Sequence, residues 1–335
     1  MGGNAFEHLK RLNAADYKIY AQEVKNRLTP HFKKIREIPY YHQKPDFGDL
    51  DLLIEKPRPE RRELEKLLIE GFALQTQDIF WNKDIVSFKY ENFQTDLIFV
   101  APEHFATAQF YFAYNDLNNL VGRIAHKFGV KFGWDGLTYQ IRTESGHRAQ
   151  KLQLSTQPAE IYAFLGYDYQ RWQKGFENLA EIFEFVCTTP YFNPEIFAYE
   201  ALNHQNRTRN KKRFTYQEFL TWLDQQSFKA YRFEEDKSVY LIRLHNAFPQ
   251  ADLLGQLKAY AQEQAGFEAQ REKFNGERVM AWTGLNGQDL GLSIAGFRKH
   301  IQTQTQESFE AWLEPRSAEE IEQSFRNWFS SVTTP

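Results

Sequence analysis

The stretch that decides the fold reads Phe47-Gly48-Asp49-Leu50-Asp51-Leu52-Leu53-Ile54. In a β-strand, successive side chains point to opposite faces of the sheet. Asp49 and Asp51 would therefore project together, while Leu50 and Leu52 pack on the other side. The stretch predicts a largely buried strand that carries two carboxylates on one face.

A third aspartate, Asp96, lies in a second apolar stretch at residues 93–100. If this second strand pairs beside the first, Asp96 completes a cluster of three carboxylates. Hard oxygen ligands suit Mg²⁺, which keeps part of its coordination shell for water and substrate phosphates; Mn²⁺ is the alternative ion. Two such ions, roughly 4 Å apart, activate a hydroxyl nucleophile and stabilise a pyrophosphate leaving group. We therefore expect Asp49, Asp51 and Asp96 to be metal ligands and catalytic residues.

Helical and extended patterns alternate around these two stretches. Apolar residues recur at helical spacing in residues 14–28 and 59–70. Extended patterns occur at residues 34–42, 79–90 and 93–100. These elements predict an α+β fold, with a mixed sheet and flanking helices, followed by a mainly α-helical C-terminal region.

Composition sets limits on partners and compartment. The 335 residues include 41 basic and 44 acidic ones, so any contact with nucleic acid must come from a local basic patch. The single cysteine, Cys187, cannot form an internal disulfide. No apolar run approaches the ~20 residues that span a bilayer, and the N-terminus lacks the order of a signal peptide. We expect a cytoplasmic protein without a membrane partner. The sequence contains no Walker loop, nucleophile elbow or paired-cysteine motif.

The aspartate pattern resembles the palm of the DNA polymerase beta superfamily of nucleotidyltransferases. Gly48 opens the pattern, and a third aspartate follows on a later strand. The segment from Tyr111 to Arg123 is similar to the family X polymerase segment that binds the incoming nucleotide, because Tyr-Phe, Asp, Asn and Arg recur at the family spacing. The resemblance covers residues 44–142.

This resemblance implies a role for each matching residue. Asp96 would receive or orient the proton of the primer hydroxyl. Tyr111 and Phe112 would lie against the sugar, where an aromatic face forms a flat wall. The remaining implied nucleotide-binding residues are Asp116 near the base, Asn119 at its minor-groove edge and Arg123 on the templating side.

The chain departs from the family where the triphosphate is usually held. Family members have a Gly-Ser pair with arginines before the aspartate strand, whereas this chain has residues 40–44, which end in Lys44. We expect Lys44 and Gly48 to contact the nucleotide. Gly2 and Gly3 are a candidate replacement for the Gly-Ser pair, since backbone N–H groups bind phosphate. The family also has a glycine where this chain has Tyr114.

One concentrated basic run predicts contact with nucleic-acid phosphates. It comprises Arg207, Arg209, Lys211, Lys212 and Arg213. Each phosphate neutralised by such a residue releases counterions and makes binding salt-dependent.

Glycines punctuate the C-terminal third of the chain. Residues 274–277 and 284–291 are similar to a glycine-rich turn in the helical domains of tRNA nucleotidyltransferases. Such a turn could bind phosphate at a helix N-terminus. The simpler interpretation is that these glycines end and begin closely packed helices, and we favour it.

Together these features predict four segments: a palm at 1–100, a nucleotide-binding segment at 101–150, a helical domain with the basic run at 151–235, and a C-terminal helical domain at 236–335. The expected activity is Mg²⁺-dependent transfer of nucleoside monophosphates from an NTP or dNTP to a DNA or RNA 3′ end, with family X-like DNA polymerase activity as the leading version. The alternatives are tailing of RNA such as a tRNA end, adenylylation of a small molecule, and a catalytically silent nucleic-acid-binding protein.

Overall fold

The computed structural model describes residues 5–142 and 149–333. The described residues form two compact units, and the boundary between them falls at Leu253 and Leu254. The first unit contains all the described strands, and the second contains only helices. The predicted α+β class is confirmed by a mixed five-stranded sheet that accompanies the helices. The finer division into four segments stays a prediction.

The central sheet of the first unit has the strand order β2-β4-β7-β6-β5. Only β4 and β7 are parallel, because α2, β5 and β6 lie between them in the chain and return it to the same end of the sheet. The strands are β2 (Ile35–Glu37), β4 (Asp49–Glu55), β5 (Ile79–Asn82), β6 (Ile85–Tyr90) and β7 (Phe93–Val100). A separate ribbon pairs β1 (Leu12–Asn13) with β3 (Asp46–Phe47).

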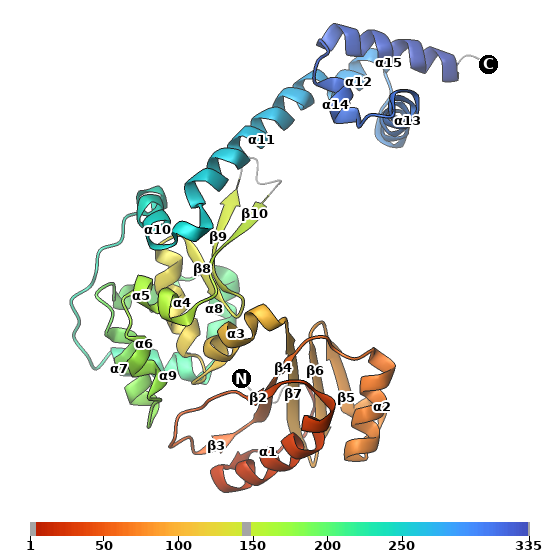
Figure 1. Ribbon diagram of the computed structural model, residues 1–335. Coiled ribbons are helices and arrows are strands. Elements are labelled where there is room, and N and C mark those ends of the chain that lie inside the picture. Colours follow the sequence, from red (N-terminus) through yellow and green to blue (C-terminus); the bar gives the residue numbers. More distant parts are fainter. Residues whose placement is uncertain (1–4, 143–148, 334–335) are drawn as a thin grey trace. The chain divides into compact units, whose positions relative to one another are not determined.

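Helices α1 (Ala14–Leu28) and α2 (Arg61–Phe72) cover one face of the central sheet (Figure 1). The Asn13 side chain caps α1 by accepting hydrogen bonds from the first turn. On β4, the alternation predicted from the sequence is confirmed: Leu50 and Leu52 are fully buried in the core under these helices. Leu53 points to the opposite face, where it packs against α3 (Phe105–Phe112). The opposite face therefore begins with aspartates and becomes apolar further along.

One predicted strand is shorter than its pattern. The sequence predicted extended structure over residues 34–42, but β2 ends at Glu37. The Ile38 N–H still donates to the Asp51 carbonyl at 3.3 Å, and Pro39 then has no N–H to continue the ladder. Instead, the Pro39 carbonyl accepts the Tyr114 N–H at 2.7 Å, which ties this loop to a distant segment.

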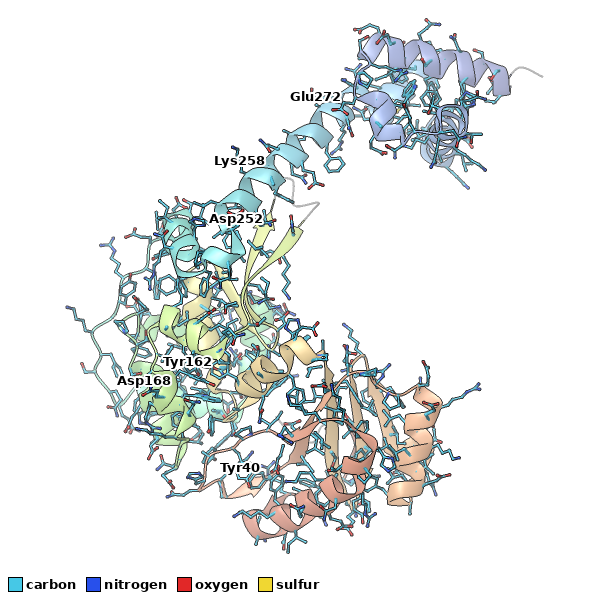
Figure 2. All side chains as sticks on the ribbon, in the orientation of Figure 1. Tyr40, Tyr162, Asp168, Asp252, Lys258 and Glu272 are labelled. Atoms are coloured by element: carbon cyan, nitrogen blue, oxygen red, sulfur yellow. The ribbon has the colours of Figure 1, made fainter. Side chains whose placement is uncertain are left out.

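The rest of the first unit combines helices with a small antiparallel sheet of order β10-β9-β8. The strands are β8 (Val130–Gly133), β9 (Gly136–Arg142) and β10 (Ala149–Ser155), and the helices are α4 (Leu117–Lys127), α5 (Pro158–Leu165), α6 (Tyr169–Gln173), α7 (Leu179–Cys187), α8 (His204–Asn210), α9 (Phe214–Leu223) and α10 (Leu241–Ala247). Tyr162 on α5 is fully buried, and its hydroxyl donates to Asn118 Oδ1 at 2.8 Å (Figure 2). This bond satisfies two polar groups inside an aromatic core.

The second unit is a set of helices around an aromatic cluster. They are α11 (Leu253–Lys273), α12 (Gly276–Thr283), α13 (Gly287–Thr305), α14 (Phe309–Leu313) and α15 (Ala318–Thr333). Phe297 and Phe325 are fully buried at its centre. Gly284, with φ of 73°, ends α12, and Gly287 begins α13, so the predicted helix, turn and helix are confirmed. Across residues 5–142 and 149–333, every helix is too short or too polar to cross a membrane.

Candidate active site

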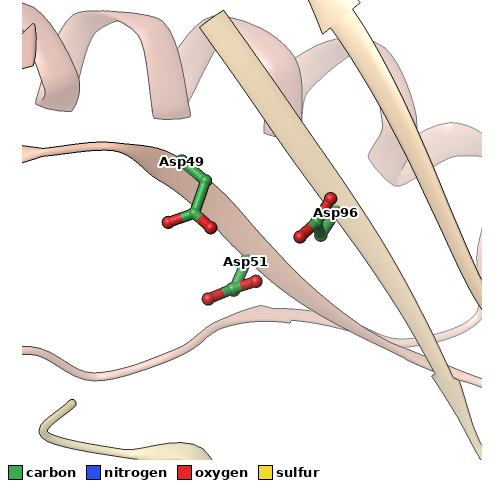
Figure 3. Close-up of side chains that lie close together, drawn as sticks. All are labelled: Asp49, Asp51 and Asp96. Atoms are coloured by element: carbon green, nitrogen blue, oxygen red, sulfur yellow. The ribbon is translucent and has the colours of Figure 1, made fainter. Parts of the chain in front are cut away.

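Three carboxylates meet where β4 and β7 run side by side. The parallel register places Asp51 opposite Asp96, and Asp49 opposite Gln94. One carboxylate oxygen from each aspartate lies within 4.8 Å of the others (Figure 3). The structure thus brings together the three residues that the sequence predicted as metal ligands.

Gln94 holds the carboxylate of Asp96 in place. Its Nε2 donates to both oxygens of Asp96, at 2.8 and 3.1 Å, while its Oε1 accepts the Ala5 N–H at 2.9 Å. Burial raises the pKa of Asp96 to about 6, and the charge of Asp49 adds to that rise. Hydrogen bonds from Ser87 and Gln94 favour the ionised form and therefore counteract the rise in pKa.

Burial also raises the pKa of Asp51 well above its ordinary value, and the charges of Asp49 and Asp96 raise it further. Lys44 acts in the opposite direction. Its own pKa is lowered by burial, although Asp49 and Asp51 partly offset that effect. Three carboxylates near one lysine keep an excess of negative charge, and a divalent cation that accepts oxygen ligands would neutralise it. The donor set therefore fits Mg²⁺ or Mn²⁺.

Asp49 and Asp51 line a cleft of about 940 Å³, which is within the size range of small-molecule sites, whereas Asp96 lies beside them on β7 and is not part of the lining. Asp49 and Asp51 lie on one wall, which we call the acidic wall. The rest of the lining includes residues from the end of α3, the start of α4, the last turn of α8 and its connection to α9. Several of these residues are basic, so the cleft lining carries both acidic and basic side chains.

Tyr111 and Phe112 line the cleft at the end of α3, and the sugar contact that the resemblance implied stays a prediction. The Tyr111 ring meets Phe112 and Phe132 edge-on, with centroids 5.5 and 5.2 Å apart. Burial raises the pKa of the Tyr111 hydroxyl, although Arg209 and Arg213 act in the opposite direction. Tyr111 therefore presents a fixed aromatic surface and a protonated hydroxyl.

A sharp bend follows these aromatic residues without a glycine. Tyr114 and Asn115 both adopt the left-handed conformation, with φ of 57° and 61°. Burial of the Tyr114 ring against Trp172 and Phe176, together with the hydrogen bond to Pro39, holds the bend. Non-glycine residues in this region are strained, and such strain clusters at functional sites. Asn115 is thereby placed in the cleft lining.

Asp116, Asn119 and Arg123 differ in their access to the cleft. Asp116 lines it but forms a mostly buried ion pair with Arg213. Asn119 also lines it, and its Nδ2 donates to Asn210 Oδ1 at 3.4 Å. Arg123 lies one turn further along α4, is only 8% exposed, and donates to the Ile196 carbonyl at 3.2 Å. The structure does not bring Arg123 to the cleft, because its guanidinium is directed into the core.

The basic run divides in the same way. Arg209, Lys212 and Arg213 line the cleft, and we call them the basic wall. Arg207 instead donates to the carbonyls of Tyr199 and Leu202, both at 3.0 Å. The Lys211 ammonium lies over the Tyr199 ring, 5.7 Å from its centroid. The structure thus brings only part of the run to the cleft.

Some of the residues expected to contact the nucleotide lie just before β4. Lys44 and Gly48 both line the cleft. The Lys44 ammonium lies 4.5 Å from the centroid of the Phe47 ring. Gly2 and Gly3 lie outside the described residues, so their proposed role stays a prediction.

The sequence did not predict several residues of the cleft. Arg11, Tyr17, Tyr40, Asp46, Asn115 and Phe214 are among them. Arg11 and Asp46 form an ion pair beside the acidic wall. A signal was available for Phe214, because it directly follows the basic run. Arg11 and Tyr17 come from the N-terminal region, and only the folded sheet reveals that they reach the site.

No protein-family model matches this chain, and no curated protein matches its sequence. The functional argument therefore depends on the residues of the site.

Proposed function

We propose that this protein is a Mg²⁺-dependent nucleotidyltransferase with a palm of the DNA polymerase beta type. It would add nucleoside monophosphates from an NTP or dNTP to a nucleic-acid 3′ end and release pyrophosphate. The observation that carries the proposal is the cluster of Asp49, Asp51 and Asp96 on parallel neighbouring strands, beside a cleft that Asp49 and Asp51 line together with the basic wall. Three partly buried carboxylates that lie this close together repel one another, and a bound cation would relieve that repulsion.

The proposed reaction forms one phosphorus–oxygen bond and breaks another. The 3′ oxygen attacks the α-phosphorus, the bond to the β-phosphate oxygen breaks, and pyrophosphate leaves. Asp49, Asp51 and Asp96 would hold Mg²⁺, which when bound acidifies the hydroxyl and neutralises charge on the phosphates. Asp96, which lies beside Asp51 on the neighbouring strand, would accept or orient the hydroxyl proton.

Other residues of the cleft would position the nucleotide. Tyr111 and Phe112 supply an apolar surface for the sugar, and Asn119 supplies an amide for the base edge. Asp116 would act indirectly, because its carboxylate already pairs with Arg213. The basic wall would attract phosphates into the cleft, where solvent is partly excluded and electrostatic interactions are stronger than in water.

A primer-extension assay tests this function. The purified full chain is incubated with Mg²⁺, a labelled primer and each of the eight NTPs and dNTPs, with the primer either single-stranded or annealed to a template that overhangs it. We expect extension with release of pyrophosphate. Extension that follows the template complement identifies a polymerase, and extension of single strands by a fixed nucleotide identifies a terminal transferase.

A matched preparation distinguishes this activity from contamination. The Asp49→Asn, Asp51→Asn double variant, purified in parallel, must lose the extension. Equal extension by the wild type and the double variant would contradict the proposal. Absence of extension, together with no Mg²⁺-dependent binding of a nucleoside triphosphate, would do the same.

A further inference from the structure

Most cations that line the cleft already have a partner. Arg213 pairs with Asp116, and Arg11 pairs with Asp46. Lys44 lies over Phe47 and is attracted by the carboxylates of the acidic wall. These cations are therefore partly neutralised before any ligand binds.

Arg209 and Lys212 differ from the other lining cations. Both side chains are exposed, both line the cleft, and neither forms a side-chain hydrogen bond or ion pair with the described residues. Arg209 acts electrostatically on the hydroxyl of Tyr111, which lines the same cleft. The cleft thus contains two cations whose charge is available to a ligand.

The backbone that carries these two residues is anchored. Asn210 lies between them, is only 2% exposed, and accepts a hydrogen bond from Asn119 of α4. Tyr216 on α9 is fully buried, and its hydroxyl donates to the Phe197 carbonyl at 2.6 Å. Arg209, in the last turn of α8, and Lys212, in the connection that follows it, therefore project from backbone that is held by its neighbours, which reduces the entropy lost when a ligand binds.

The shape of the basic run favours a compact anion over a long one. Arg207 and Lys211 are engaged at Tyr199, so the run does not present a continuous stripe of cations. A single-stranded nucleic acid is bound along a groove that follows its backbone over several nucleotides. A polyphosphate instead concentrates its charge over a few ångströms, and two neighbouring cations can satisfy it.

We propose that Arg209 and Lys212 bind the terminal phosphates of a nucleoside triphosphate. This inference rests on the proposed function, because the acidic wall would hold the ions that accompany the same triphosphate.

Calorimetric titration with tripolyphosphate tests the inference, because this probe has neither base nor sugar. The titration uses the full chain in Mg²⁺ and compares the wild type with the Arg209→Ala, Lys212→Ala double variant. We expect the dissociation constant to rise about 30-fold, as two charge-assisted contacts are lost. The thermal midpoint should not change, since both side chains are exposed.

The chain offers a matched control. Lys229→Ala combined with Arg232→Ala removes the same two residue types, at the same spacing, from exposed positions in the same unit that do not line the cleft. This control should bind tripolyphosphate within about twofold of the wild type. Equal weakening in both double variants would overturn the inference, because it would show a general effect of net charge.

Two further comparisons separate the possible failures. Asp49→Asn with Asp51→Asn should remove the Mg²⁺ dependence of tripolyphosphate binding, and persistence of that dependence would contradict the proposed function itself. If the Mg²⁺ dependence is lost but Arg209→Ala, Lys212→Ala binds like the wild type, only the inference fails.

Fluorescence anisotropy with a labelled single-stranded oligonucleotide identifies the source of the phosphate. A larger loss for the oligonucleotide than for tripolyphosphate would assign the two cations to the polynucleotide and overturn the inference.

Discussion

The acidic and basic walls of the cleft are built in different ways. The aspartates lie on regular strands, where the parallel register of β4 and β7 sets which carboxylates are neighbours. The cations lie on the last turn of α8 and on its connection to α9, where Arg213 pairs with Asp116 and the described residues give Arg209 and Lys212 no ion-pair partner. Like charges gather on the acidic wall at a cost in stability, whereas the basic wall is partly neutralised by Asp116. On the proposed function, the acidic wall would gain stability from a bound cation and the basic wall would receive a bound anion.

The largest expected effect comes from the acidic wall. Asp51→Asn should reduce turnover by at least about 10³-fold, because a preorganised charge at the reacting centre is lost. The same change should raise the thermal midpoint without Mg²⁺, since burial and the charges of Asp49 and Asp96 oppose ionisation of Asp51. Extension kinetics and calorimetric melting measure the two effects.

Asp46→Asn is the control for that variant. Asp46 lines the same cleft, but it lies outside the carboxylate cluster and its side chain is 49% exposed in its pair with Arg11. An exposed ion pair contributes little, so stability should change by less than about 1 kcal/mol. A fully active Asp51→Asn protein with a normal melting profile would contradict the role of the acidic wall.

The acidic wall was also the more predictable of the two. Alternation along residues 47–54 predicted that Asp49 and Asp51 share a face, because a strand has a period of two residues. The register that places Asp96 opposite Asp51 was not predictable, since it depends on a crossover through α2, β5 and β6. The local pattern determines which face of a strand each side chain lies on, whereas tertiary packing determines which strand lies beside it.

The sequence predicted the basic run, but it did not predict which of its residues line the cleft and which are engaged elsewhere. Only the fold shows that Arg207 and Lys211 are engaged at Tyr199, while Arg209 and Lys212 remain available. Arg123 illustrates the same limit, because its place on α4 directs it into the core rather than to the cleft. The bend at Tyr114 was likewise hidden, since packing rather than a glycine maintains it.

The second prediction concerns the ion pair between Arg213 and Asp116, which distinguishes Arg213 from the other two cations of the basic wall. Asp116→Ala should lower the free energy of unfolding by about 3 kcal/mol, because it leaves a mostly buried guanidinium without its counter-charge. The side chains of Arg213 and Asp116 are 15% and 13% exposed. The Asp116 side chain makes no capping hydrogen bond to α4, so the loss would report the pair alone. Urea unfolding measures it.

Two variants sharpen that test. Adding Arg213→Met to Asp116→Ala should restore most of the loss, because the unpaired charge is removed. Asp84→Ala breaks an exposed ion pair, in which the Asp84 side chain is 54% exposed and the Lys56 side chain 36% exposed. This variant should lower the free energy of unfolding by less than about 1 kcal/mol. If Asp116→Ala costs no more than Asp84→Ala, the pair is not the neutralising element that distinguishes the basic wall.

The third prediction uses pH to probe the repulsion between Asp96 and the acidic wall. The pKa of Asp96 in the folded protein is about 6, above its ordinary value of 3.8. Between these values the folded protein holds a proton that the unfolded chain has released, so the free energy of unfolding falls as pH rises through this window. Without metal, the Asp96 contribution should be on the order of 1–2 kcal/mol between pH 4.5 and 7.

Asp96→Asn isolates this contribution. Urea midpoints of the wild type and the variant, measured in EDTA across that range, should diverge as pH rises, with the variant losing less stability. Mg²⁺ at pH 7.5 should raise the midpoint of the wild type more than that of the variant, because the ionised carboxylate is the form that binds metal. Parallel pH profiles in EDTA would show that the carboxylate does not titrate in this window.

The smallest expected effect lies at the bend between the two walls. Asn115 has φ of 61°, a conformation that asparagine tolerates better than most residues and that glycine adopts freely. Asn115→Ala should lower the free energy of unfolding by about 1 kcal/mol, and Asn115→Gly should leave it nearly unchanged. Asn92, with φ of 58° in the turn between β6 and β7, provides a comparison away from the cleft, because its alanine variant should show the same loss. A loss of stability in the Asn92 variant without a loss in the Asn115 variant would contradict this prediction. It would mean that the bend relaxes when the Asn115 side chain is removed. The spacing of the two walls would then be set by Tyr114 and its aromatic neighbours.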